Sequence, residues 1–574
     1  MTAHTIRMSG AQIVIHLLER QKISTIAGIP GGANLPLYDA LSRSRSIRHV
    51  LARHEQGAGF IAQGMARVTG APAVCFATSG PGATNILTAI ADAKLDSIPV
   101  VCITGQTPRP LIGTDSFQEV DVYGMSIPIT KHNFMARSAG ELLEIIPEAF
   151  RIASSGRPGP VLIDIPKDVQ TEEAAFDAWP EPGRPDAPPE PDGAAIARAA
   201  SFINASRRPI LYIGGGVIQA EASELAVALA EKASIPTAMS LMGLGALPSA
   251  HPLALGMLGM HAARATNLAL EECDLLIAAG VRFDDRATGK VEAFCPQAKI
   301  VHIDIDPAEI DKLKTPHAAI VGDAGRVFEA LLPQVERNPR RDWLTRVGKL
   351  QEEHPFARNG ADDLGSPCGI ITRTAGLVDE DAVIVTDVGQ HQMWTAQHYP
   401  FRRPRRWLTS GGLGTMGFGL PAAIGAALAR PQSQVVCFSG DGSIMMNIQE
   451  LATAVEQNAN VTVIVLNNCA LGLVRQQQSL FYGNRIYASV YPSQVDFVKI
   501  AEGFGVKAYD LARASDPSAV LEQALKGPGP RLIHARIDAN EQVLPMTPPG
   551  AANKDMIEAT MEGEANVRHF RACA

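Results

Sequence analysis

The sequence lacks several features that would place it in other classes of protein. None of its apolar runs reaches the length of about 18 residues that a membrane-spanning helix needs. Lysine and arginine number 51 against 59 aspartates and glutamates, and the net charge of −8 argues against nucleic acid as the main partner, because binding to phosphates needs concentrated positive charge. The eight cysteines form no CxxC pair, and scattered thiols inside apolar runs are typical of a reducing compartment.

The start of the chain also lacks the marks of export. Its first twenty residues contain neither a charged segment followed by an apolar core nor an Arg- and Ser-rich transit peptide. With 46% hydrophobic and 19% charged residues, the composition excludes bulk disorder. We therefore expect a cytoplasmic protein with no membrane and no nucleic-acid partner, and 574 residues suggest three or four domains at about 150 residues each.

Short β-branched runs alternate with longer helical stretches along most of the chain. The clearest runs are VCFA, VVCITG, VLIDIP, ILYIGGG, LLIAAG, IVHIDID, AVIVTDVG, QVVCFSGDG, VTVIVLNN and RLIHARID. Runs that are apolar on both faces and separated by helices are typical of parallel sheets covered on both sides. Two polar stretches, the Pro-rich 176–194 and the segment around 338–366, divide the series. We expect three doubly wound α/β domains at 1–185, 190–345 and 365–548, and a flexible or covering C-terminal tail at 549–574.

The sharpest local pattern is SQVVCFSGDGSIMMNIQELATAVEQNANVTVIVLNN at 433–468, which predicts strand, tight turn, helix and strand. Asp441 follows the first strand and Asn468 the second, so the carboxyl ends of two neighbouring parallel strands should bring both side-chain oxygens together. Such oxygens suit Mg²⁺, which keeps places for phosphate oxygens, and Gly440 and Gly442 allow close backbone approach. A lone GDG is more often only a tight turn, but GDG and NN at this spacing predict a diphosphate–magnesium site.

This segment resembles the signature of thiamine-diphosphate enzymes, and the likeness extends over nearly the whole chain. The motifs ARHEQ, SGPGATN, GTDSFQE, ITKHN, SGRPGPV, RFDDR, GQHQMW and GLGTMGFGLPAAIGA occur in this order. Together they resemble the catalytic subunits of the acetolactate synthase (acetohydroxyacid synthase) family. The resemblance implies decarboxylation of pyruvate and condensation of the two-carbon unit with pyruvate or 2-ketobutyrate, as in branched-chain amino-acid biosynthesis.

The resemblance also implies cofactors and partners. The three domains would bind, in chain order, the pyrimidine ring of thiamine diphosphate, FAD, and the diphosphate with Mg²⁺. A homodimer or dimer of dimers would place each active site at a subunit interface, and a small regulatory subunit would be a further partner. Because the reaction moves no net electrons, the FAD would be structural.

In the first domain, the resemblance assigns the catalytic role to Glu55, which would contact N1′ of the aminopyrimidine and promote proton loss from the thiazolium. Alone, a glutamate at a helix start is explained by the helix dipole. Gly80 in SGPGATN would pack close to the cofactor, although a plain turn explains it equally well. The family's substrate-facing positions correspond here to Gly32, Phe117, Gln118 and Lys167, of which Lys167 also suits a solvated surface.

In the third domain, the resemblance implies two further groups around the cofactor. Gly389, Gln390, His391, Gly442 and Ser443 would hold the diphosphate, while Gly414 and Met416 would support its bent form. The metal ligands would be Asp441, Asn468 and the backbone carbonyl of Ala470.

In the central domain, the resemblance implies a flavin site. Its residues would be Arg157, Gly214, Gly215, Gly216, Met260, His261, Arg282, Asp284, Asp304 and Asp323. The glycine triplet by itself equally marks an ordinary turn after a strand. Arg286 corresponds to the family residue that holds the carboxylate of the second keto acid, an anion that suits a guanidinium fork.

The sequence departs from the family pattern at two positions. Gln477 stands where a tryptophan usually favours 2-ketobutyrate, so we expect weaker discrimination between the two acceptors. Cys469 stands where an acidic residue is common, a change that need not disturb a metal bound by the next residue's carbonyl.

Three other functions stay open at this point: a flavin oxidoreductase of the pyruvate-oxidase type, a non-catalytic paralogue that serves as a binding partner, and a glyoxylate carboligase. Intact Glu55, Asp441 and Asn468 argue against the paralogue. Glyoxylate carboligases lack the activating glutamate that Glu55 matches.

Overall fold

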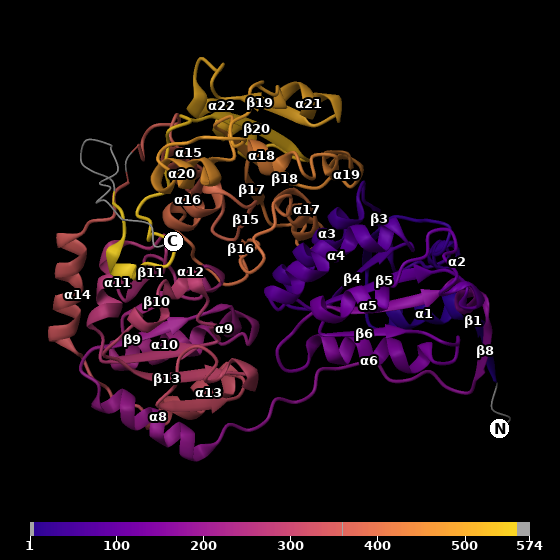
Figure 1. Cartoon of the computed structure of the whole chain (residues 1–574), viewed down its shortest axis with the longest axis horizontal. Coiled ribbons are helices and arrows are strands. Elements are labelled where there is room, and N and C mark those ends of the chain that lie inside the picture. The colour runs from indigo at the N-terminus through magenta and orange to yellow at the C-terminus, as the bar shows by residue number, and fades with distance from the viewer. Residues whose placement is uncertain (1–4, 359, 559–574) are drawn as a thin grey trace.

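A computed structural model of the chain describes residues 5–358 and 360–558 and contains three six-stranded sheets (Figure 1). All ten runs singled out in the sequence form strands of these sheets, and every strand pairing within them is parallel. The predicted fold class, doubly wound α/β in three units, is therefore confirmed. In the part of the chain that the structure describes, no helix is long and apolar enough to cross a membrane.

The first unit is built on the sheet β3-β2-β4-β5-β7-β6. Its strands are β2 (Thr25–Gly28), β3 (Arg48–Leu51), β4 (Ala73–Ala77), β5 (Val100–Gln106), β6 (His132–Met135) and β7 (Val161–Pro166). Its helices are α1 (Gly10–Arg20), α2 (Leu35–Leu41), α3 (Glu55–Thr69), α4 (Pro81–Leu95), α5 (Val122–Ser126), α6 (Leu142–Ser154) and α7 (Lys167–Thr171). The strands β1 (Ile6–Ser9) and β8 (Glu173–Phe176) form a separate antiparallel pair. The central strands β4, β5 and β7 are buried throughout, as layers of helices on both faces require.

The central unit follows the same plan, with the sheet order β11-β10-β9-β12-β13-β14. Its strands are β9 (Pro209–Ile213), β10 (Thr237–Met239), β11 (Ala254–Met257), β12 (Leu275–Ala279), β13 (Lys299–Asp304) and β14 (Ala318–Val321). Its helices are α8 (Gly193–Ala205), α9 (Gly215–Gln219), α10 (Ser223–Ala233), α11 (Arg264–Glu272), α12 (Asp285–Thr288), α13 (Ala324–Leu331) and α14 (Arg341–Glu353).

The third unit has the sheet order β16-β15-β17-β18-β20-β19. Its strands are β15 (Val383–Thr386), β16 (Trp407–Leu408), β17 (Val435–Gly440), β18 (Val461–Asn467), β19 (Lys507–Asp510) and β20 (Arg531–Arg536). Its helices are α15 (Pro367–Leu377), α16 (Gln390–His398), α17 (Gly419–Ala429), α18 (Asp441–Ile444), α19 (Glu450–Glu456), α20 (Gly472–Phe481), α21 (Phe497–Gly503) and α22 (Pro517–Lys526). Because β17 and β18 are adjacent and parallel, the residues that follow them meet at one edge.

Helices α3 and α17 join the first and third units in close contact. A Cβ added to Gly64 would lie 2.1 Å from the Ala422 carbonyl oxygen, and one added to Gly425 would lie 2.0 Å from the Ile61 carbonyl oxygen. Beside them the rings of Phe60 and Phe418 pack at 5.3 Å between centroids. Glycine at both crossing points is therefore what allows the two backbones to touch.

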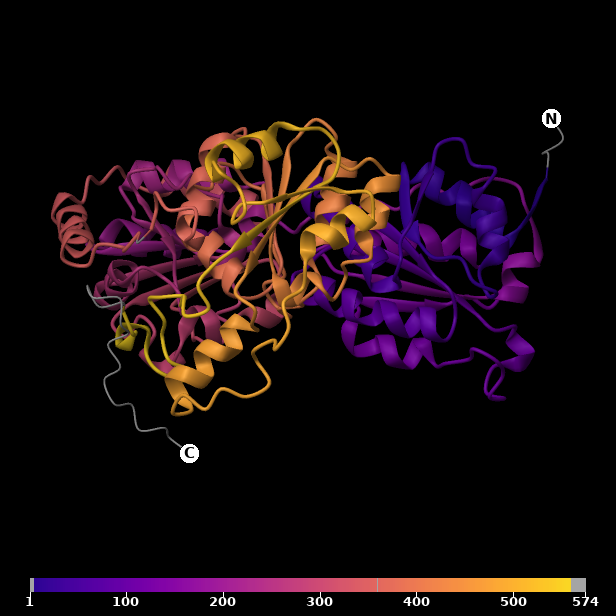
Figure 2. The ribbon, with the colours of Figure 1, turned by 90° about the horizontal axis from the view of Figure 1, so that it is seen from above.

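Two segments without regular strands run between the units. Residues 177–192 pass from β8 to α8 without helix or strand, as Figure 1 shows. The segment at 541–558 leaves the third unit and returns to the central one (Figure 2), where Ala551 accepts from the Lys290 backbone N–H and Asn553 donates to the Ala287 carbonyl. Residues 549–558, the start of the expected tail, thus cover the central unit, and 559–574 lie outside the described residues.

Candidate active site

The carboxylate of Asp441 and the amide oxygen of Asn468 lie together at the carboxyl ends of β17 and β18. The Ala470 backbone N–H donates to the Asn468 Oδ1 at 3.2 Å. Burial raises the pKa of Asp441 to about 6, and backbone N–H groups, including those of Gly442, Ala470 and Asn468, oppose this rise. The Ala470 N–H therefore bonds the Asn468 oxygen and also opposes the rise in the pKa of Asp441, whose strand is adjacent. A carboxylate oxygen, an amide oxygen and a backbone carbonyl oxygen, here that of Ala470, are ligands that Mg²⁺ prefers, so these residues fit that ion.

Buried polar side chains surround this turn. Gln390, the first residue of α16, accepts from the Asn468 Nδ2 at 3.0 Å. Ser443 lies 3.5 Å from the Nε2 of His391, and burial lowers the pKa of His391 to about 3, which keeps its imidazole neutral. Gly389 directly precedes this helix. The predicted diphosphate residues thus gather around Asp441 and Asn468, with α16 supplying one side and α18 the other.

The segment that carries Gly414 and Met416 is held by carboxylates. Asp92 accepts from the hydroxyls of Ser410 and Thr415, and Asp96 accepts from the Gly412 backbone N–H at 2.7 Å. Both aspartates lie at the end of α4 in the first unit and also bond the buried Arg67 guanidinium. Farther along the segment, Asp387 accepts from the Gly417 N–H at 2.7 Å. Contacts from two units therefore fix the backbone on either side of Gly414 and Met416.

Glu55 begins α3 and is only 9% exposed. Its carboxylate accepts from Asn85 at 3.0 Å and would lie 3.2 Å from a Cβ added to Gly82. A Cβ on Gly80, which has a φ of +53°, would lie 2.8 Å from the Gln118 carbonyl oxygen. Glu55, Gly80 and Gln118 are thus neighbours around the start of α4.

The other substrate residues predicted in the first unit, Gly32, Phe117 and Lys167, lie at or near its surface. Phe117 is 87% exposed, and a Cβ at Gly32 would meet nothing within 4 Å. Lys167 is half-buried at the start of α7. Within one chain, none of these three residues lines the main cavity.

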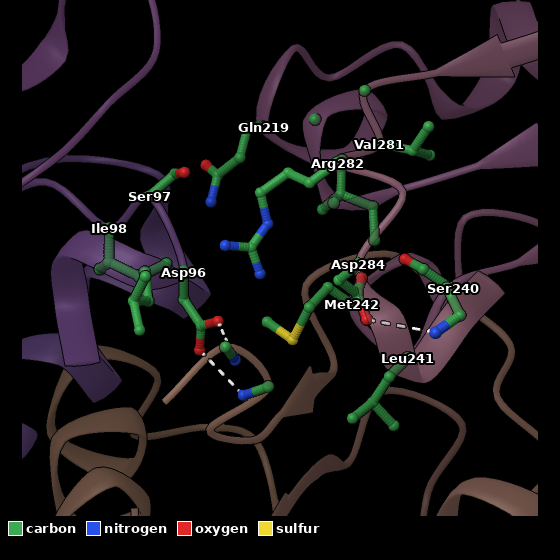
Figure 3. A pocket seen from close by; sticks show the side chains of 18 of the residues that line it. Asp96, Ser97, Ile98, Gln219, Ser240, Leu241, Met242, Val281, Arg282 and Asp284 are labelled. Carbon is green, nitrogen blue, oxygen red and sulfur yellow. Dashed lines mark hydrogen bonds between the residues drawn. The ribbon is translucent and has the colours of Figure 1, made fainter. Parts of the chain in front are cut away.

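A cavity of about 760 Å³ lies between the three units, and Figure 3 shows the Arg282 side chain pointing into it. Most predicted flavin residues line this cavity: Arg157, Gly215, Gly216, Met260, His261, Arg282, Asp284, Asp304 and Asp323. Arg286, Gly414 and Gln477 line it as well, whereas Glu55, Asp441 and Gly214 do not. The predicted substrate residues Arg286 and Gln477 therefore share a space with the predicted flavin residues.

The groups that line the cavity have the chemistry of a dinucleotide site. A Cβ on Gly216 would lie 2.6 Å from the Cα of Gly280, so the turn after β9 approaches the turn after β12 closely. Arg157 pairs with Glu309 at 2.7 Å and with Asp306 at 3.1 Å. Burial raises the pKa of Asp304 to about 6. Glycine turns, guanidinium groups and strand-end carboxylates are the groups that bind dinucleotides in such sheets.

The structure adds residues that the sequence patterns did not indicate. Arg405, from the third unit, lines the cavity and donates to the Gln219 carbonyl of the central unit. Asp92 and Asp96 contact residues more than 300 positions later in the chain. No local motif marks these three side chains, because each contact joins separate units.

Comparisons with known proteins define the class of this site. Residues 8–125 match the N-terminal TPP binding domain of thiamine pyrophosphate enzymes. Residues 196–331 match the central domain of these enzymes, and residues 387–535 match their C-terminal TPP binding domain. The fold and the site are thus those of a thiamine pyrophosphate enzyme.

Relatives that match over nearly their full length show which family of thiamine pyrophosphate enzymes the chain belongs to. The chain is 60% identical to the acetolactate synthase isozyme 1 large subunit of Escherichia coli over 96% of this chain and 98% of that one. It is 46% identical to the isozyme 2 large subunit of the same organism, over 96% and 100%. It is also 44% identical to the acetolactate synthase large subunit of Parasynechococcus marenigrum, over 99% and 94%. The chain therefore belongs to the acetolactate synthase large-subunit family.

Proposed function

We propose that this chain is the catalytic subunit of an acetolactate synthase. It decarboxylates pyruvate and joins the two-carbon unit to pyruvate or 2-ketobutyrate, which gives 2-acetolactate or 2-aceto-2-hydroxybutyrate. The observation that carries the proposal is that Asp441 and Asn468 follow two adjacent parallel strands, where the Ala470 N–H bonds the Asn468 oxygen and opposes the rise in the pKa of Asp441.

The metal and diphosphate would be held at these strand ends. Asp441, Asn468 and the Ala470 carbonyl would bind Mg²⁺. The diphosphate would contact His391, Ser443 and the backbone at the start of α16, where Gln390 lies. Bound thiamine diphosphate would supply a carbon nucleophile that adds to the keto group and stabilises the two-carbon unit after CO₂ leaves. A neutral His391 suits this place as a hydrogen-bonding group, because its depressed pKa makes it a poor carrier of positive charge.

Glu55 would hold a proton at the pyrimidine nitrogen. In this chain it faces Asn85 and Gly82 and lies outside the main cavity. Phe117, Leu35 and Ile127 of the same unit are exposed apolar side chains, which suits burial against a second subunit. We therefore infer a homodimer or a dimer of dimers in which each active site takes Glu55 from one chain and Asp441 from the other.

The cavity between the units would hold FAD and the acceptor side by side. Arg286 would bind the acceptor carboxylate with its guanidinium, while Gln477 would form the wall next to the acceptor's alkyl group. The Asp92 and Asp96 contacts would keep the 410–417 segment in place during turnover. Because its relatives are named large subunits, a small subunit is a further proposed partner.

A product assay tests this function. The purified chain is incubated with pyruvate, thiamine diphosphate, Mg²⁺ and FAD, and acetolactate is measured after its conversion to acetoin. Asp441→Ala should abolish product, whereas Asp379→Asn should not, because Asp379 is exposed and precedes β15 at the opposite end of the sheet. Flavin bleaching by pyruvate at a catalytic rate, with no carbon–carbon product, would instead establish an oxidase.

A further inference from the structure

Gln476 on α20 is a buried amide that has no part in the function proposed above. Its side chain is 2% exposed and bonds the backbone of Val543 twice. The Nε2 donates to the Val543 carbonyl at 2.9 Å, and the Oε1 accepts from the Val543 N–H at 2.9 Å. Because a backbone N–H can only donate and a backbone carbonyl can only accept, Val543 fixes which end of the Gln476 amide points which way.

The fixed amide of Gln476 in turn orients the side-chain amide of Gln390. The Nε2 of Gln390 donates to the Gln476 Oε1 at 2.9 Å and to the Glu541 carbonyl at 2.9 Å. Two acceptors therefore face the nitrogen end of the Gln390 amide, and its oxygen end must point the other way. If Gln390 turned over, its oxygen would face two oxygens and two buried hydrogen bonds would be lost.

The oxygen of Gln390 then orients a third amide, which is the one beside Asp441. Asn468 donates through Nδ2 to the Gln390 Oε1 at 3.0 Å. Its Oδ1 is left to accept from the Ala470 N–H, at the end of the strand next to the one that Asp441 follows. The series of hydrogen bonds from Val543 through Gln476 and Gln390 to Asn468 thus determines that an oxygen of Asn468, and not its NH₂ group, lies beside Asp441.

The packing around these amides leaves them little freedom. Gly472 lies one helical turn before Gln476, and a Cβ added there would lie 1.9 Å from the Gln390 Oε1 and 2.6 Å from the Asn468 Nδ2. The start of α20 therefore packs directly against the two side chains that share this hydrogen bond. The same helix carries Leu473 and Gln477 into the main cavity.

We propose that Gln476 is a positioning residue for the metal: acting through Gln390, it holds the Asn468 amide with its oxygen toward the bound Mg²⁺. The inference rests on the proposed metal site at Asp441 and Asn468. Without Gln476, only the Glu541 carbonyl would still hold the nitrogen of Gln390. The Gln390 and Asn468 amides would then turn over together more readily, and an amide nitrogen would face the cation. An NH₂ group cannot bind a metal ion, so loss of Gln476 should weaken Mg²⁺ binding without removing a ligand.

The test measures metal binding rather than turnover. Apoenzyme is titrated with Mg²⁺ at fixed thiamine diphosphate, and binding is followed by tryptophan fluorescence, for which Trp394 on α16 lies one turn from Gln390. In Gln476→Met the Mg²⁺ concentration for half-saturation should rise by about 10- to 100-fold, the usual effect of losing a side chain that orients a metal ligand. The conservative Gln476→Glu still offers Gln390 an oxygen and should fall between wild type and Gln476→Met.

The matched control is Gln434→Met. Gln434 belongs to the same unit and also joins two backbone segments, through Asp379 and Leu525, but it precedes β17 at the far end of the sheet. Its Mg²⁺ half-saturation should match wild type, and thermal unfolding of each apoenzyme separates metal effects from folding.

Two results would overturn the inference. One is a Gln476→Met titration that matches Gln434→Met, and the other is a loss in Gln476→Glu as large as that in Gln476→Met. If wild-type protein itself showed no Mg²⁺-dependent binding of thiamine diphosphate, the proposed function would fail instead.

Discussion

Replacing Gly64 with alanine perturbs the helix contact that joins the first and third units. The new Cβ would lie 2.1 Å from the Ala422 carbonyl oxygen, so reaching the 3.0 Å that real contacts keep requires about 0.9 Å (3.0 − 2.1) of separation. The neighbouring atom belongs to a helix backbone and cannot rotate away. The helices α3 and α17 must therefore move apart along a buried interface that includes Phe60 and Phe418.

The expected cost follows from the packing. Overfilling a packed interior costs about 1–3 kcal/mol, and the better helix propensity of alanine returns up to about 1 kcal/mol. A net loss of about 1–2 kcal/mol corresponds to a decrease of roughly 2–8 °C in the unfolding midpoint for a unit of this size. Because α3 begins at Glu55 and α17 begins three residues after Met416, product formation should fall as well.

Differential scanning calorimetry and the acetolactate assay, run on the same preparations, measure both effects. The matched control is Gly348→Ala in the interior of α14, where an added Cβ would meet nothing within 4 Å. This control should gain up to about 1 kcal/mol from helix propensity alone. If Gly64→Ala unfolded at or above the wild-type midpoint, the close contact between α3 and α17 would not require glycine at this position.

Four further outcomes are expected. Glu55→Gln should lower turnover by about 10²- to 10⁴-fold while thiamine diphosphate still binds, which steady-state assays and cofactor titration would show. Burial raises the pKa of Asp164 to about 7, so the folded state keeps a proton that the unfolded chain loses near about pH 4. The free energy of unfolding of wild type, relative to that of Asp164→Asn, should therefore fall as the pH rises from about 4 to about 8. Urea unfolding of both proteins at a series of pH values measures this, and a difference in free energy that stays constant with pH would contradict it. Dialysis against EDTA should release thiamine diphosphate but not flavin, because Asp441 lies outside the main cavity; joint loss of both cofactors, seen by absorbance, would contradict separate sites. Gln477→Trp should raise the preference for 2-ketobutyrate over pyruvate by up to about 10- to 200-fold, the range that one methylene group provides. An unchanged product ratio when the two acceptors compete would show that this position does not contact the acceptor.

The sequence by itself determined the parallel strands and the spacing of the residues that follow them. The runs β4, β5, β9, β12, β17 and β18 are apolar on both faces, and such a run has few stable places other than the middle of a covered sheet. Because β17 and β18 are neighbours, that spacing also brought Asp441 and Asn468 together. Their meeting depends only on strand direction and the length of one helical crossover, which are local properties of the chain.

Only the tertiary structure decided which distant side chains support that site. Asp92 and Asp96 hold the segment before Met416 across more than 300 residues, and Gln476 meets Val543 after two further strands and two further helices. No periodicity or motif encodes these contacts, since the first two depend on how the first and third units pack together and the third depends on where the chain returns after β20. A hydrogen bond between distant residues is fixed by the whole fold, whereas the strand and turn that present each partner are fixed by a few neighbouring residues.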